Sequence, residues 1–176
     1  MPKRGSIPFL KFNVNPFHLF DKQWFLLTCG DFSKGRFNSM TISWGSLGIM
    51  WDKPFVQVVV RPTRYTFEFM NQYDNFTLCG FGEKSRSALN LLGTKSGRDG
   101  NKIKASGLTS IASKNIAAPA YAEADLILEC KKMYWQDYDH SHFLLPQIEH
   151  KYPSKDYHRV FFGEIVAIFG IDKFKS

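Results

Sequence analysis

The stretch FNSMTISWGSLGIMWDKPFVQVVVRPTRYT, residues Phe37–Thr66, decides the fold of this chain. Its segment Phe55–Val60 is rich in β-branched residues and bounded by prolines, which predicts a secure strand. Ser39–Trp44 alternates in polarity and predicts a second strand, and the glycines of 45–48 predict a turn beyond it. Hydroxyls, backbone amides and two arginines within one supersecondary unit indicate a site for a phosphorylated ligand.

Outside this stretch, the pattern predicts further strands joined by short helices. The strands are expected at 23–29, 75–81, 122–132 and 160–169, and the helices at 63–72, 84–92 and 101–105. Thr63 is the expected N-cap of the first helix, and Gly93 is expected to end the second. Glu123, Asp125 and Glu129 suggest one wet face on the strand at 122–132, and Gly163 inside the last strand indicates a bulge or the close approach of a ligand. No regular crossover helices separate the strands, which argues against a doubly wound parallel sheet. The chain is therefore expected to be mostly β with short helices, a β-barrel in one domain spanning 1–176. Residues 1–20 are expected to be an extended, aromatic N-terminal arm, because its prolines oppose a helix.

Composition narrows the range of functions. The net charge of +7 comes from basic residues spread along the chain, and no zinc-finger or RNA-binding signature accompanies them, so nucleic acid is not expected as a partner. The apolar runs are too short for a signal peptide or a membrane span, which predicts a cytoplasmic protein without membrane attachment. The three cysteines form no CxxC pair and fit a reducing compartment.

A loop from Tyr138 to Pro153 offers an alternative chemistry, because it and the residue before it carry side chains able to bind a metal. These are Asp137, Asp139, His140, His142 and His150. Metal ligands are usually held on rigid elements with supporting hydrogen bonds, so we predict no metal site here. The sequence also lacks GxSxG, P-loop and GxGxxG motifs, which argues against a serine hydrolase, a P-loop nucleotidase and a Rossmann dinucleotide site.

Three motifs in order resemble the flavin reductase-like family, whose members have an FMN-binding split barrel and commonly form homodimers. The first is MTISWG, followed by KP and RPTRYT, within 40–66; the second is SGRD with Lys102; the third is DYHRVFFGEIV at 156–166. The middle motif is similar to the flavoredoxin branch. The resemblance covers roughly residues 15–169 and implies an FMN-binding, homodimeric split β-barrel.

The resemblance assigns residues to the flavin ring. Strand alternation puts Thr41 and Ser43 on one face, and the resemblance directs them to the polar edge of the flavin. Asn38 and Met40 would contribute mainly through their backbone. Trp44 departs from the smaller residue of many members and is expected to cover the flavin or narrow the substrate space. The alternative is a barrel strand with a wet outer face.

The remaining candidate residues are assigned to the phosphate of FMN and to the reactive edge of its flavin ring. Arg64 and Thr66, assisted by Arg61, are expected to bind the phosphate where a helix begins. The alternative is a set of solvated residues at a helix start. The resemblance places His158 beside the nicotinamide or the reactive edge of the flavin, as a positioning residue. An ordinary histidine at a strand start is the competing interpretation.

Three functions remain open at this stage. The first is an oxidoreductase that transfers hydride from NAD(P)H, bound transiently, through FMN to free flavin, a redox partner protein or a small acceptor. The second is an FMN-binding electron carrier without its own NAD(P)H activity. The third is a barrel that has lost flavin and binds another ligand.

Overall fold

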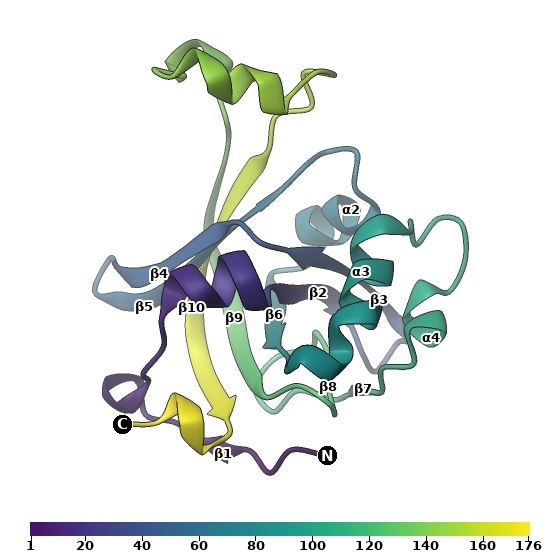
Figure 1. Ribbon diagram of the computed structural model, residues 1–176, viewed down its shortest axis with the longest axis vertical. Coiled ribbons are helices and arrows are strands. Elements are labelled where there is room, and N and C mark those ends of the chain that lie inside the picture. Colours follow the sequence, from purple (N-terminus) through teal and green to yellow (C-terminus); the bar gives the residue numbers. More distant parts are fainter.

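The protein, described over all 176 residues by a computed structural model, is built around one curved antiparallel sheet of eight strands (Figure 1). Seven strands follow the order β3-β2-β6-β9-β10-β5-β4, and the short β1 pairs with β10. The strands are β1 Gly5–Ser6, β2 Phe25–Asp31, β3 Arg36–Ile42, β4 Gly45–Met50, β5 Lys53–Val60, β6 Asn75–Gly80, β9 Leu126–Asp137 and β10 Arg159–Gly170. The prediction of a mostly β chain with short helices is confirmed.

The sheet curls back on itself between its two ends. β3 and β4 are the first and last strands of the order, yet only Ser43 and Trp44 separate them in the chain. Such a short link forces the two edges of the sheet to approach one another. They do not pair, so the barrel stays split at this point. Any groups exposed along the split come from both ends of the sheet.

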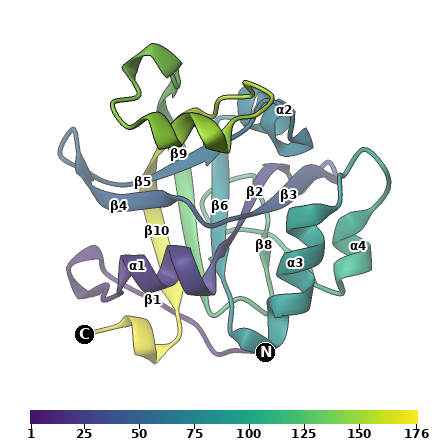
Figure 2. The same cartoon turned by 45° about the horizontal axis from the view of Figure 1, so that its top comes forward.

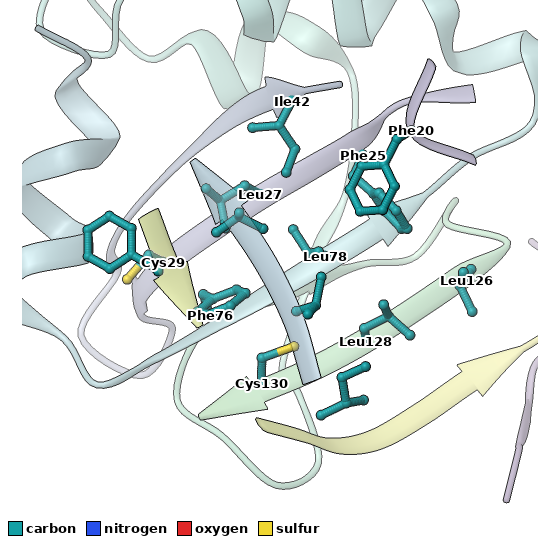
Figure 3. Packing of buried hydrophobic residues seen from close by; sticks show 14 of the residues in the cluster. Phe20, Phe25, Leu27, Cys29, Ile42, Phe76, Leu78, Leu126, Leu128 and Cys130 are labelled. Atoms are coloured by element: carbon teal, nitrogen blue, oxygen red, sulfur yellow. The ribbon is translucent and has the colours of Figure 1, made fainter. Parts of the chain in front are cut away.

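The interior of the sheet is filled by apolar side chains of alternate strand positions (Figure 3). Leu27 of β2 lies opposite Leu78 of β6, and Cys29 lies opposite Phe76 in this cluster. Burial of a large apolar side chain contributes about 1.5–3 kcal/mol, so these rows dominate the stability of the barrel. A second cluster, centred on Tyr121, lies between the outer face of the sheet and the helices.

Short helices cover the outside of the sheet (Figures 1 and 2). They are α2 Tyr65–Gln72, α3 Arg86–Thr94 and α4 Lys102–Ser106. A two-stranded ribbon, β7 Ser110–Ile111 with β8 Ala120–Tyr121, follows them. The connection between β9 and β10, residues 138–158, carries two 3-10 helices, His140–His142 and Pro146–Lys151, and stands away from the barrel at the top of Figure 1. We call it the β9–β10 connection.

The N-terminal arm lies on its own barrel. β1 pairs with β10, Phe12 bridges to Lys175, and Ile7 is buried in the main cluster. The arm is not extended throughout, because α1 Pro16–His18 and a π-helical turn Leu19–Gln23 close it. Asn15 caps α1 by accepting from His18 N, and a proline at the first helical position needs no N–H partner there.

Glycine caused two wrong predictions. The expected turn at 45–48 is the strand β4, where a Cβ on Gly45 would lie 2.4 Å from Gln57 O and 2.6 Å from Phe20 Cε1. Gly93, expected to end its helix, lies inside α3, where a Cβ would lie 3.2 Å from Thr41 Cβ. In both places glycine serves close packing between elements.

Two side-chain predictions also differ from the structure. Thr63 was the expected N-cap of α2, but Arg64 occupies that position, and the Thr63 hydroxyl donates to Asp156 instead. Glu129 was expected on a wet face of its strand, but it is buried. Its carboxylate accepts from the backbone of Lys114 and Asn115, which compensates for the loss of water.

Candidate functional site

A cavity of about 180 Å³ opens where the sheet is split. β3 and the Ser43–Trp44 link form one side, and the ends of β5 and the start of β10 form the other. The split therefore brings together residues more than a hundred positions apart. The lining residues are Met40, Thr41, Ile42, Ser43, Trp44, Val59, Arg61, Arg64 and His158.

Two hydroxyl groups lie at the end of β3, that of Ser43 without a hydrogen-bond partner and that of Thr41 with one. Ser43 Oγ makes no hydrogen bond within the protein and is not sealed from solvent, so it is available to a ligand. Thr41 Oγ1 donates to Leu89 O of α3 over 2.6 Å, so this hydroxyl can only accept from a ligand. Met40 is buried and lines the cavity. β3 is also an edge strand, which leaves polar backbone groups on its outer side without a strand partner.

The two arginines of the cavity differ in their partners. Arg61 donates to Asp156 Oδ1 over 2.6 Å and to Lys151 O over 2.7 Å, and its guanidinium lies 4.8 Å from the ring centre of Tyr152. Its charge is thus paired with a carboxylate, and its contacts join the β9–β10 connection to the end of β5. Arg64, at the N-cap of α2, has no carboxylate within ion-pair distance and no side-chain hydrogen bond. It is the uncompensated cation of the cavity.

His158 faces the Ser43–Trp44 link across the split. Its ring centre lies 5.3 Å from that of Trp44, and its Nδ1 lies 2.8 Å from the hydroxyl of Tyr152. Burial lowers the pKa of His158 to about 4, with a further lowering by the charge of Arg61 that Asp156 partly opposes. The imidazole is therefore neutral at pH 7.

Two predicted residues lie outside this cavity. Asn38 and Thr66 are both buried, and Asn38 Nδ2 donates to Thr66 Oγ1 over 2.7 Å, which joins β3 to α2. Asn38 lines a neighbouring, larger cleft of about 500 Å³, together with Tyr65 and Lys102. That cleft contains no other predicted site residue. It also lacks the facing rings of Trp44 and His158, which we call the Trp44–His158 wall, so the smaller cavity is the better candidate site.

Sequence reasoning missed two residues that shape the site, Tyr152 and Asp156, and a third, Lys102, that lines the neighbouring cleft. Tyr152 bonds to His158 and Asp156 pairs with Arg61. Tyr152 comes from the predicted loop Tyr138–Pro153, and Asp156 was noted only as the first residue of the third motif, so nothing in the pattern assigns their partners. Lys102 was noted only as part of a motif. It is buried, donates to Leu92 O and Lys95 O at the end of α3, and has its pKa lowered to about 8 by burial and then by the charge of Arg64.

The structure gives no support to the metal alternative in the β9–β10 connection. No three His, Cys, Asp or Glu side chains of the chain come together in a metal-binding arrangement. The acidic side chains there have other partners, since Asp137 pairs with Arg159 and Asp139 accepts from Ser141.

None of the helices has the length and hydropathy that a membrane span needs.

Comparison with known protein families decides where this architecture belongs. A family model described as "Flavin reductase like domain" matches residues 17–174, nearly the whole chain. The chain belongs to the flavin reductase-like family. Curated proteins yield no match to it.

Solved structures show the same fold at low sequence identity. An FMN-binding domain of a flavin reductase-like enzyme from Shewanella baltica aligns with a TM-score of 0.70 and 18% identity, over 96% of this chain and 78% of that one. Flavoredoxin from Desulfovibrio vulgaris gives 0.63 and 21%, over 82% and 67%. The 2-nitrobenzoate 2-nitroreductase of Pseudomonas fluorescens gives 0.65 and 19%, over 93% and 70%. The fold of this flavin reductase-like chain is therefore the split barrel.

Proposed function

We propose that this flavin reductase-like protein binds FMN in the cavity at the split and transfers reducing equivalents through it. The observation that carries the proposal is the convergence of an unpaired cation, Arg64, a free hydroxyl, Ser43, and the Trp44–His158 wall on one cavity. A flat, phosphorylated ligand needs these three features together. Bound FMN would accept a hydride from NAD(P)H and pass the two electrons to free flavin or another acceptor.

The phosphate is assigned to Arg64 and the start of α2. An arginine fork without a carboxylate partner, beside the first N–H groups of a helix, favours a dianion. Arg61 adds positive charge nearby, but its guanidinium is held by Asp156, so its contribution is smaller. Thr66 would act indirectly, because its hydroxyl is buried against Asn38.

The ring is assigned to the space between β3 and His158. Ser43 can donate to the polar edge of a flavin, and the Thr41 hydroxyl can accept from an N–H of that edge. Trp44, about half exposed, limits the access to this space from solvent. The neutral His158 is suited to hydrogen bonding and positioning, and it is a poor candidate for a proton donor at pH 7.

A second function is supported by the similarity to flavoredoxin, whose name describes a redox carrier. The chain would then bind FMN and accept electrons from a partner protein without reacting with NAD(P)H. An anaerobic titration of the FMN-loaded protein separates the two functions. Bleaching of the flavin absorbance by NADH or NADPH supports the reductase, whereas bleaching only by dithionite or a reduced partner supports the carrier. A protein that fails to take up FMN contradicts both.

We also propose that the protein forms a homodimer. The cavity volume of about 180 Å³ is below the roughly 300 Å³ at which ligand sites usually begin, so a further wall is needed to enclose a flavin. Trp51, at the turn between β4 and β5, contacts Tyr134 and Phe162 in an exposed aromatic patch. Exposed aromatic patches are typical of subunit interfaces, and a second copy of the chain would cover this one.

A further inference from the structure

The β9–β10 connection contains an aromatic cluster that contacts the ring of His158. Tyr152 is buried, stacks on Phe143 with ring centres 5.9 Å apart, and lies under the guanidinium of Arg61. Its hydroxyl lies 2.8 Å from His158 Nδ1. The backbone is fixed as well, because Tyr138 N donates to His158 O over 2.9 Å. Both the ring and the main chain of His158 are thus held by this connection.

The direction of the Tyr152–His158 hydrogen bond follows from the two groups. Burial raises the pKa of the Tyr152 hydroxyl, so the phenol keeps its proton. The imidazole is neutral at pH 7 and carries one N–H. Tyr152 has no other acceptor for its proton, so the phenol donates and Nδ1 accepts. The proton of the imidazole then resides on Nε2.

The remaining nitrogen is free to meet a ligand. Every buried side-chain nitrogen or oxygen of the chain has a hydrogen-bond partner, whereas His158 Nε2 has none and is therefore accessible. His158 lines the cavity, as Ser43 does. An Nε2–H group in this place would donate to a carbonyl oxygen and would repel a second N–H.

We infer that Tyr152 is a positioning residue that fixes His158 as an Nε2–H donor toward the carbonyl oxygen of a planar ligand in the cavity. Such a ligand would be the flavin ring, the carboxamide of a nicotinamide or a carbonyl-bearing acceptor, and this choice rests on the proposed function. The tautomer does not rest on it, because it is set by contacts within the chain. Loss of the hydroxyl would free the ring to adopt both tautomers and to turn.

The test compares Tyr152→Phe with wild type in the full-length protein. Nitrogen-15 NMR of the imidazole, without flavin, is expected to show Nε2 protonated in wild type and a mixture of tautomers in Tyr152→Phe. Tyr157→Phe is the matched control, because Tyr157 stacks in the same cluster but its hydroxyl donates to Glu149. A proton on Nδ1 in wild type, or an unchanged tautomer in Tyr152→Phe, would overturn the inference.

A second measurement tests the consequence for the ligand. With FMN bound, Tyr152→Phe is expected to slow reduction of the flavin by NADH or NADPH roughly tenfold, because loss of one hydrogen bond costs about 1.4 kcal/mol. FMN affinity is expected to change less than threefold. Tyr157→Phe is expected to leave both values unchanged. A tautomer that shifts with no change in reduction rate would overturn the role toward the ligand. Failure of FMN to bind at all would contradict the proposed function, and the NMR result would still stand.

Discussion

At the scale of single residues, Arg64 is the most direct test of the site. Arg64→Ala is expected to weaken FMN binding about 10- to 100-fold, because hydrogen bonds to charged groups contribute roughly 1.5–3 kcal/mol. Fluorescence quenching of FMN measures the affinity. Arg98→Ala is the control: Arg98 also lies beside the start of α2, but it pairs with Glu68 and lies outside the cavity. Unchanged affinity in Arg64→Ala would remove Arg64 from the phosphate site.

His158 makes a prediction about pH and stability. Its pKa is about 4 in the folded protein and about 6.5 when unfolded, so between these values the unfolded chain binds more protons. Stability therefore rises with pH through this window and is lost as pH falls from 6.5 to 4, by roughly 3 kcal/mol. Urea unfolding at several pH values measures this change. In His158→Gln the unfolding free energy should vary less with pH between 4 and 6.5 than in wild type. The same dependence of stability on pH in His158→Gln and wild type would contradict the prediction.

The residues of the site could be predicted to different degrees. Seven of the nine predicted side chains line one cavity, because the motifs that carry them lie at the end of β3, after the end of β5 and before the start of β10, which meet at the split. Asn38 and Thr66 do not, because a short polar side chain can bond a neighbouring element as readily as a ligand. No sequence pattern distinguishes these two uses. Tyr152 could not be predicted either, since its hydrogen bond depends on how a non-repetitive segment folds over β10.

At the scale of elements, glycine was the least predictable residue. The FVQVVV strand and the helix after RPTRYT were predicted correctly, because β-branched runs and a change of hydrophobic period are local signals. Gly45 and Gly93 signal turns locally, but both are needed for close contacts between elements distant in sequence. Of the two alternatives predicted at Gly163, a bulge or the close approach of a ligand, the bulge is confirmed, since the β9–β10 register shifts between Phe162 and Gly163.

Gly163 also provides a test at this scale. A Cβ there would lie 2.5 Å from Phe76 Cζ and 3.1 Å from Cys130 Cβ, inside the main cluster. Gly163→Ala is expected to cost roughly 1–3 kcal/mol of unfolding free energy through overpacking, with a fall of about 2–4 °C in Tm for each kcal/mol. Thermal unfolding followed by circular dichroism measures it. Gly5→Ala, where a Cβ meets nothing within 4 Å, should unfold like wild type.

At the scale of the whole molecule, the exposed apolar surface connects assembly with function. Ile49, Met50 and Trp51 form the tip of the β4–β5 hairpin and are exposed, next to the aromatic rings of β9 and β10. β4 is also the sheet edge that faces the split, so the cavity lies where this strand begins and the exposed tip lies where it ends. A second copy that covered β4 along its whole length would reach from the tip to the proposed flavin site, and dimer formation and FMN affinity should then be coupled.

This coupling can be tested with one surface variant. Ile49→Lys places a charge at an exposed position of the hairpin, so it is expected to leave the folded monomer intact but to oppose burial against a second copy. Sedimentation velocity should show a dimer for wild type and a monomer for Ile49→Lys, and FMN affinity should fall in parallel. Leu10→Lys, an exposed position of the N-terminal arm, is the control and should remain dimeric. A monomeric wild type that binds FMN tightly would show that the single-chain cavity is sufficient, and the wall that encloses the flavin would then have to come from Trp44.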